Sequence, residues 1–144
     1  MTFGTNRMEK ALLLTRLPRT ALSTEFTYKQ KRFALVNVQL VLLASNKIRY
    51  RHINMIINML KRKTIPSFII GDFNIPSLLA KNKLMTYMKN SGYTTLEKRT
   101  PTFRLAFIKY QLDYAFARKG KIKEMEIDRV KFSDHYPVTI EALI

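Results

Sequence analysis

The order in which apolar runs alternate with polar segments is the feature that most constrains the fold of this chain. Short runs rich in Val, Leu and Ile, at 11–14, 33–44 and 68–70, have the length and composition of buried strands. Between the second and third runs, residues 46–63 carry Ile and Leu every three or four positions, which predicts an amphipathic helix capped by Ser45 or Asn46.

The second half of the chain begins with another predicted helix and continues as strands. Ser77 has the side chain of a helix N-cap, Leu84 and Met88 lie one turn apart, and Gly92 suits the position beyond a helix end. Because helices and strands alternate first and strands then dominate, the pattern indicates an α/β sandwich in a single domain over 1–144. Further strands are expected at 23–32, near Phe103, and at 112–117, 122–132 and 137–144.

Composition sets the class of protein. At 144 residues with 47% hydrophobic residues, the chain is long enough to bury a core. It has no cysteine, which excludes disulfides and thiolate metal sites and fits an intracellular location, cytoplasmic or nuclear. The basic N-terminal stretch, with Arg7, Lys10 and Arg16, leaves an organellar presequence as an alternative. No window approaches the roughly 20 apolar residues that span a bilayer, so a membrane is not expected.

Net charge favours a polyanionic partner. The 26 Lys and Arg residues exceed the 10 Asp and Glu residues, which gives +16 and a field that attracts DNA or RNA. Solvated lysines spread over the surface are the alternative. Basic residues also cluster along the sequence, and the cluster at 118–123 predicts substrate-binding roles for Arg118, Lys119 and Lys121.

Three polar clusters lie at the ends of predicted strands. They are Gly-Asp-Phe-Asn at 71–74, Asp113 within an apolar strand, and Ser-Asp-His at 133–135. Taken singly, each has a structural explanation, as a turn, an edge-strand residue or an interior histidine. A carboxylate or imidazole emerging from apolar surroundings costs free energy unless it is paired or binds a metal, so together they mark a candidate active site.

In this order the three clusters resemble the motifs of the endonuclease/exonuclease/phosphatase superfamily, which includes DNase I-like nucleases. The family hallmarks are a GDxN loop, a strand bearing Asp-Tyr, and Ser-Asp-His before the last strand; here they stand at 71–74, 113–114 and 133–135. The segments at 11–18 and 100–103 are also similar to family segments. The resemblance implies a DNase I-like sandwich of two sheets.

The resemblance also implies a role for each residue. Asp72 would orient or deprotonate the attacking water and, with Asp134, bind Mg²⁺, with Mn²⁺ as an alternative. Asn74 would hold the scissile phosphate. His135 would contact the phosphoryl oxygens as negative charge develops, and Asp113 would orient its imidazole.

Two departures from the family pattern follow from the positions of these motifs. The match begins near the middle of the family domain, so the chain is expected to correspond to its C-terminal half to two-thirds. The family's metal-binding Glu then has no counterpart, since neither Glu9 nor Glu25 lies in a similar context. Gln39 stands where many members carry a His; its amide can donate a hydrogen bond to a phosphate but cannot transfer a proton near neutral pH.

Because of these departures, both the covering of the incomplete sheet and the activity of the chain have alternatives. A sandwich that lacks its opening strands should expose a sheet edge or an apolar face, which a second copy of the chain or a partner chain would cover. The expected activity is Mg²⁺-dependent phosphodiester hydrolysis in nucleic acid. The alternatives are a nucleic-acid-binding protein with an impaired site and a phosphatase for small or lipid phosphates.

Overall fold

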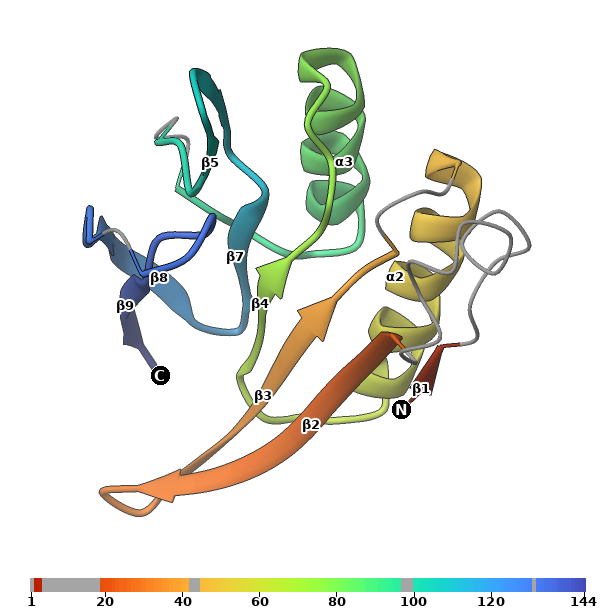
Figure 1. The fold of residues 1–144 in the computed structure, drawn as a ribbon. Helices are drawn as coiled ribbons and strands as arrows, with labels where there is room; N and C mark the ends of the chain where they lie inside the picture. Colours follow the sequence, from red (N-terminus) through yellow and green to blue (C-terminus); the bar gives the residue numbers. More distant parts are fainter. Residues whose placement is uncertain (1, 4–18, 42–44, 97–99, 131) are drawn as a thin grey trace.

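The computed structural model describes residues 2–3, 19–41, 45–96, 100–130 and 132–144 (Figure 1). The strand predicted at 11–14 and the family-like segment at 11–18 lie outside these residues. The helices are α2 (Asn46–Lys61) and α3 (Leu78–Asn90); the strands are β1 (Thr2–Phe3), β2 (Arg19–Tyr28), β3 (Lys31–Gln39), β4 (Ser67–Asp72), β5 (Phe103–Leu105), β6 (Ile108–Tyr110), β7 (Asp113–Arg118), β8 (Lys121–Ile127) and β9 (Val138–Leu143).

A five-stranded mixed sheet forms the centre of the molecule, in the order β1-β2-β3-β4-β7. Strands β2 and β3 form an antiparallel hairpin, β3 and β4 run parallel, and β7 lies antiparallel to β4. The parallel pair requires a crossover, which α2 provides. The carboxyl ends of β3 and β4 therefore meet at one edge of the sheet, next to the start of β7 (Figure 1).

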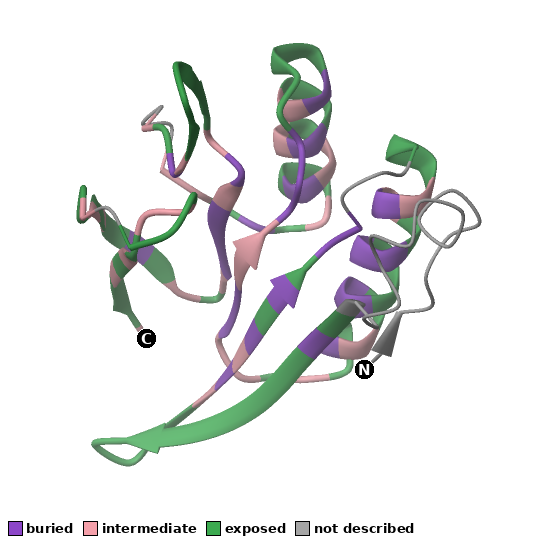
Figure 2. Ribbon diagram, in the orientation of Figure 1, coloured by how far each residue is buried: buried purple, intermediate pink, exposed green. Residues whose placement is uncertain are grey.

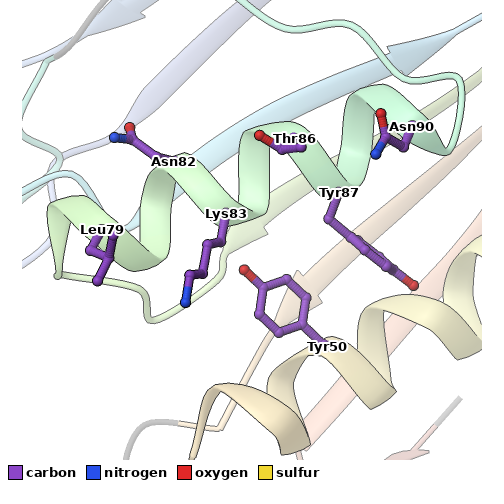
Figure 3. A pocket seen from close by; sticks show the side chains of 7 residues that line it. All are labelled: Tyr50, Leu79, Asn82, Lys83, Thr86, Tyr87 and Asn90. Carbon is purple, nitrogen blue, oxygen red and sulfur yellow. The ribbon is translucent and has the colours of Figure 1, made fainter.

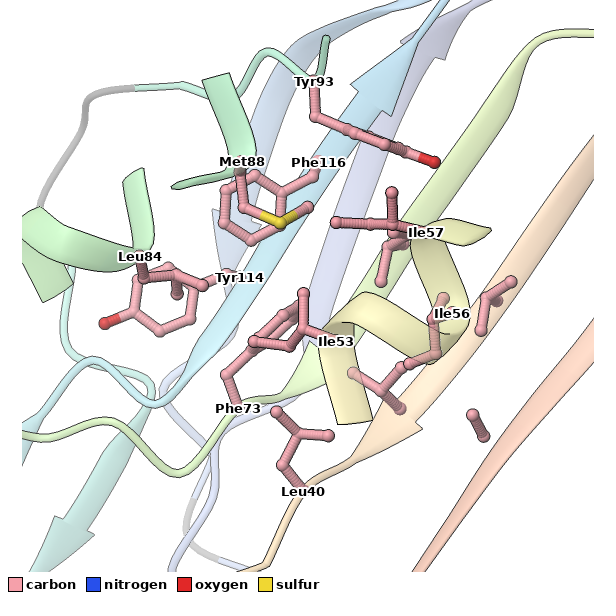
Figure 4. Close-up of a cluster of buried hydrophobic side chains, with 14 of the residues drawn as sticks. Leu40, Ile53, Ile56, Ile57, Phe73, Leu84, Met88, Tyr93, Tyr114 and Phe116 are labelled. Carbon is pink, nitrogen blue, oxygen red and sulfur yellow. The ribbon is translucent and has the colours of Figure 1, made fainter. Parts of the chain in front are cut away.

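One face of this sheet is covered by the two helices. Most of the predicted inward positions of the helices, Ile53, Leu84 and Met88 among them, are fully buried there, whereas Met85, also predicted to face inward, is partly buried. Figure 4 shows them around the ring of Phe73, whose centroid lies 5.3 Å from that of Phe116. Burial of each such side chain contributes about 1.5–3 kcal/mol, which fixes the helices on this face.

The opposite face of the sheet is covered by fewer of the described residues. It packs against the two-stranded sheet β8–β9 through a small cluster of buried residues, Phe68, Ala115, Ala117 and Ile122. Figure 2 shows that the outer half of the β2–β3 hairpin is largely exposed. The second sheet has two strands within the described residues, as expected for a sandwich without its opening strands.

Two predicted strands differ from the structure. The strand expected at 23–32 is divided by a turn at Lys29 and Gln30, whose φ angles of 47° and 63° reverse the chain between β2 and β3. A turn with positive φ at both positions usually carries Gly or Asn, so its sequence signal is missing here. The strand expected at 122–132 ends at Ile127, and Asp128 N donates to Pro137 O across the hairpin end. No helix of the described residues is long and apolar enough to cross a membrane.

Candidate active site

Strand register brings three of the predicted site residues into one row. Gln39 is the last residue of β3 and pairs with Asp72, the last residue of β4, which pairs with Asp113, the first residue of β7. Side chains directly opposite one another project to the same face of a sheet. Because Val38 faces the helices, its neighbour Gln39 and the whole row face the other side.

Asp72 is held in place by Asn74. The Asn74 backbone N–H donates to Asp72 Oδ1 at 2.8 Å, and its amide Nδ2 donates to Asp72 Oδ2 at 2.7 Å and to Leu40 O at 2.9 Å. This local turn requires a φ of 51° at Asn74, a left-handed conformation that Asn tolerates better than most residues. Asn74 is 4% exposed, so in this structure its side chain orients the Asp72 carboxylate.

Gly71 is essential to the approach of β4 to β3. It has a φ of 125°, and a Cβ atom at this position would lie 2.2 Å from Val38 O and 2.8 Å from Asn37 Oδ1. A side chain here is excluded by both the backbone conformation and the neighbouring strand. The glycine of the motif at 71–74 is therefore a structural requirement of the strand that carries Asp72.

Asp113 and His135 form a hydrogen-bonded pair. His135 Nδ1 lies 2.9 Å from Asp113 Oδ2, with the side chains 31% and 17% exposed. The ring of Phe103 contacts the imidazole edge to face at 5.2 Å between centroids. Segment 102–104 pairs with segment 134–136, since Tyr136 N donates to the backbone carbonyl of residue 102 and Arg104 N donates to Asp134 O. The Ser-Asp-His loop is thereby attached to the β5–β6 hairpin.

The charges around His135 favour its protonated form. Its pKa is raised above the ordinary value, mainly by the hydrogen bond to Asp113 and further by the negative charges of Asp113, Asp72 and Asp134, while burial opposes this shift. Three of the predicted residues therefore lie within electrostatic range of the imidazole. An imidazolium whose Nδ1 is bound to a carboxylate can stabilise negative charge through Nε2.

Sequence reasoning missed Thr102, which positions Asp113. Its side chain is fully buried, and Thr102 Oγ1 accepts hydrogen bonds from the backbone N–H groups of Leu112 and Asp113, both at 3.0 Å. Those donors lie at the point where β7 begins and would otherwise be unpaired in the interior. A buried threonine has no sequence signal, although the family-like segment at 100–103 includes it.

Sequence reasoning also missed the exposed residues of the β5–β6 hairpin. Phe107 at the hairpin tip is 92% exposed, and Phe132, next to the Ser-Asp-His loop, is 91% exposed. The hairpin also carries Arg104 and Lys109, which pair across its two strands and are both exposed. Two aromatic rings and two cations thus accompany the Asp113–His135 pair.

The predicted substrate-binding residues at 118–121 lie at the other end of β7. Five residues separate Asp113 from Arg118, which corresponds to about 17 Å along a strand. The Arg118 guanidinium donates to Leu60 O at 2.6 Å and to Lys63 O at 3.1 Å, and Lys119 Nζ donates to Thr64 O. Lys121 is exposed. The structure brings Gln39, Asp72, Asn74, Asp113 and His135 together and separates these three residues from them.

The carboxylates at this edge fit a hard divalent cation in chemistry, but they are few. Mg²⁺ takes oxygen ligands and commonly uses one or two carboxylates together with waters and phosphate oxygens. Asp72 and Asp113 are adjacent in the row, and Asp134 is exposed and accepts a hydrogen bond from Ser133 Oγ at 2.9 Å. Within the described residues no group of three or more His, Asp or Glu side chains is arranged to hold a metal.

A hollow between the two helices is a separate feature. It has a volume of about 460 Å³ and contains the Tyr50–Tyr87 ring pair, 5.3 Å between centroids (Figure 3). Its lining residues include Lys83 and three amide or hydroxyl side chains but no carboxylate. It therefore lacks the groups needed for the chemistry described above.

No family model and no curated protein matches the sequence, whereas solved structures do. An endonuclease/exonuclease/phosphatase from Beutenbergia cavernae superposes on the whole chain, 100% of its residues, with a TM-score of 0.72 at 15% identity. The chain has the endonuclease/exonuclease/phosphatase fold. The two-sheet α/β sandwich predicted from the motifs is thereby confirmed.

Two further structures with the endonuclease/exonuclease/phosphatase fold are similar to this chain. TDP2 from D. rerio, solved in complex with a single-strand DNA product, matches 90% of the chain at 13% identity with a TM-score of 0.67. The endonuclease domain of TRAS1, a telomere-specific non-LTR retrotransposon, matches 85% at 16% identity with a TM-score of 0.69. This chain spans 44%, 64% and 61% of the length of the three solved chains, less than two-thirds of each.

Proposed function

We propose that the chain hydrolyses phosphodiester bonds in nucleic acid with the help of a divalent cation, Mg²⁺ or Mn²⁺. The main support is the pairing of Asp72 and Asp113 in one row, with Asp72 oriented by Asn74 and Asp113 bound to His135. Two oriented carboxylates and an imidazolium at one sheet edge can orient a water and stabilise the charge that develops in phosphoryl transfer. The similarity of fold to nucleases is consistent with this assignment.

In this mechanism each side chain acts at a defined atom. The Asp72 carboxylate accepts a proton from the attacking water, or orients that water toward phosphorus. His135 Nε2 donates a hydrogen bond to a phosphoryl oxygen as charge develops there, and Asp113 keeps the imidazole in that orientation. Asn74 orients the Asp72 carboxylate through two hydrogen bonds. Its contact with the scissile phosphate stays a prediction. Gln39, at the end of the row, can donate its amide N–H to a phosphate oxygen.

Asp72 and Asp134 are the residues that would hold the cation. When bound, the cation neutralises charge on the phosphoryl oxygens and lowers the pKa of a water ligand. Asp134 lies next to His135 and is exposed, so it is accessible to an ion shared with the substrate.

The preference for nucleic acid over a small phosphate ester rests on the surroundings of the row. Exposed Phe107 and Phe132 can stack on bases, and Arg104 and Lys109 can pair with phosphates. A small or lipid phosphate would leave these side chains without a role, which makes the phosphatase alternative weaker. An intracellular location belongs to the same proposal and rests on the absence of cysteine.

A nucleic-acid-binding protein with an impaired site is the second candidate. It is favoured by the small number of metal ligands within the described residues and by Gln39, which cannot transfer a proton. This candidate predicts salt-sensitive binding without turnover in either metal.

The test is cleavage of labelled single- and double-stranded DNA and RNA in Mg²⁺, Mn²⁺ and EDTA. We expect metal-dependent cleavage that falls at least about 10²-fold in Asp72→Asn and in His135→Gln, because each removes a group acting on the reacting atoms. Asp128→Asn, at an exposed position outside the row, is the matched control and should cleave normally. Binding without metal-dependent cleavage would favour the second candidate.

The proposal also includes a protein partner, either a second copy of the chain or another polypeptide, over the less covered face of the sheet. Its support is the exposure of apolar residues there, such as Phe26 and Tyr28, at 42% and 60%.

A further inference from the structure

A long apolar groove lies between the β2–β3 hairpin and β9. Its larger part has a volume of about 620 Å³. A hollow of this size accommodates several side chains. Its walls come from the hairpin, from β4 and from the last strand, and they carry few polar groups. The residues that line it are Phe26, Thr27, Tyr28, Phe33, Leu35, Phe68, Ile70, Ile140, Ala142, Leu143 and Ile144.

The groove continues into the candidate active site. A smaller hollow of about 240 Å³ shares Ile70 and Ile140 with the larger one and extends to Asp113 and Asn37. Asn37 pairs with Ile70, two positions before Gln39 and Asp72 on the same strands. Residues two apart on a strand face the same side, so the groove and the row of Gln39, Asp72 and Asp113 occupy the same face of the sheet. At the far end, Lys31 Nζ donates to Ile144 O and joins the hairpin to β9.

Strand β9 lines this groove and has one edge without a partner strand among the described residues. Within the described residues β9 pairs with β8 on one side, and no strand pairs with its other side. The N–H and C=O groups of such an edge are a template for another strand. An extended polypeptide can satisfy them and fill the groove with every second side chain, whereas a lipid or another apolar small molecule cannot satisfy the backbone groups.

Among the described residues, the site at the end of the groove has few carboxylates. The described residues hold no group of three or more potential metal ligands, and the chain as a whole has 10 acidic against 26 basic residues. The solved chains of the same fold contain substantially more polypeptide, since this chain spans 44–64% of the three described above. A segment that occupied both hollows would reach Asp113, where an additional carboxylate would join the row.

We propose that the groove binds a β-strand of a second polypeptide, apolar at alternate positions and carrying Asp or Glu at the end nearest Asp113. This strand would pair with β9, cover Ile70 and Leu143, and supply a carboxylate to the metal site. The docking makes the partner proposed above specific, and the role of the carboxylate rests on the metal-dependent activity proposed above; the docking does not depend on that activity. A second copy of this chain is disfavoured as the occupant because two chains that each carry a net charge of +16 repel each other.

A fluorescein-labelled peptide of alternating Val and Thr with Glu at each end is a direct probe. We expect micromolar binding by fluorescence anisotropy, weakened at least about tenfold when a central proline replaces one residue, because proline cannot pair with a strand edge. The protein variants Ile70→Lys and Leu143→Lys should weaken binding to a similar extent. Leu79→Lys, at a 67% exposed position of α3, is the matched control and should bind normally.

Stability and self-association are measured on the same variants. Leu143 is 52% exposed, so Leu143→Lys should unfold at the same urea concentration as the parent even if Ile70→Lys does not. Unchanged peptide binding by a folded Leu143→Lys variant overturns the proposal. So does sedimentation of the parent protein as a dimer that Leu143→Lys dissociates, since a second copy then occupies the groove.

The carboxylate is tested through Mn²⁺ affinity, followed by electron paramagnetic resonance without substrate. Because coupling between two ligands is reciprocal, the Glu peptide should strengthen Mn²⁺ binding and Mn²⁺ should strengthen peptide binding by the same factor. A peptide with Gln at each end should bind the groove without this effect. Equal Mn²⁺ affinity with both peptides overturns the carboxylate role. If cleavage is absent but the Glu peptide binds and strengthens Mn²⁺ binding, the proposed function fails and this inference stands.

Discussion

At the scale of single residues, Thr102 illustrates how a residue with no proposed role in the reaction positions one of the site residues, Asp113. Thr102→Val removes the acceptor of two buried N–H groups at the start of β7. We expect a loss of about 1–3 kcal/mol in the free energy of unfolding for each donor left unpaired. Urea denaturation measures this, with Thr139→Val at an exposed position as the control. An unchanged midpoint for Thr102→Val would show that these N–H groups find another acceptor.

Asn74 combines a backbone role with a side-chain role, and two substitutions separate them. Asn74→Gly removes the amide that holds Asp72 but adopts the positive φ without strain. Asn74→Ala removes the same amide and, in addition, places a residue at this position that adopts the positive φ less readily. Both variants should lose cleavage to a similar extent. Asn74→Ala should unfold more easily than Asn74→Gly by about 1–2 kcal/mol, the cost of the left-handed conformation for a residue with a Cβ. Equal stabilities of the two variants contradict this explanation.

The motifs led to the candidate site residues, and the resemblance also predicted one contact among them, that of Asp113 with the His135 imidazole. Asp72, Asp113 and His135 stand in family-like sequence contexts, so they could be named as candidates from the chain alone. Their meeting depends on the pairing of β3 with β4 and of β4 with β7, which joins positions far apart in sequence. That both donors of the Asn74 amide are used within the protein was equally invisible, because it requires the backbone of Leu40.

At the scale of elements, Glu25 links the β2–β3 hairpin to Lys63, which follows α2. Its carboxylate binds Lys63 and Arg32, and these hydrogen bonds, with Lys63 first, lower the pKa of Glu25 below 4.5. A lowered folded-state pKa stabilises the fold above the unfolded-state pKa, and this stability is lost as the pH falls through the folded-state value. The parent should therefore lose more stability than Glu25→Gln below pH 4.5. Urea titrations at several pH values test this; parallel pH profiles would refute it.

The elements differ in how well sequence predicts them. Helices α2 and α3 were predicted to within a few residues because their apolar residues follow the helical period and their buried faces agree with it. The turn at Lys29 and Gln30 was missed because neither residue is typical of positive φ. Strand β6 was missed because it has only three residues, all of them exposed, which is too short a run for alternation to be a signal.

At the scale of the whole molecule, the basic residues that give the net charge of +16 differ in their surroundings. Arg118 and Lys119 bond to backbone carbonyls at the far end of β7, while Arg104 and Lys109 lie on the hairpin attached to the Ser-Asp-His loop. Replacing Arg104 and Lys109 by Ala should flatten the salt dependence of single-stranded DNA binding. The expected change in log–log slope is about 0.7 for each phosphate that the variant no longer neutralises.

The matched control for this measurement is the double replacement of Lys119 and Lys121 by Ala. The structure leads us to expect an unchanged slope, because these residues lie far from the row of carboxylates. The clustering of charge along the sequence predicts the opposite, a contribution of 118–121 to substrate binding. The two slopes, measured by anisotropy between low and moderate salt, decide between these predictions.

Gly71 has a consequence for how the chain tolerates random mutation. Any side chain at this position meets the backbone of Val38 and requires an unfavourable φ, independently of catalysis. In a library selected for folding alone, without selection for cleavage, position 71 should still retain glycine, whereas Asp72 and His135 should vary freely. Invariance within the motif at 71–74 therefore has two separable origins, and a comparison of folding-selected with activity-selected libraries distinguishes them.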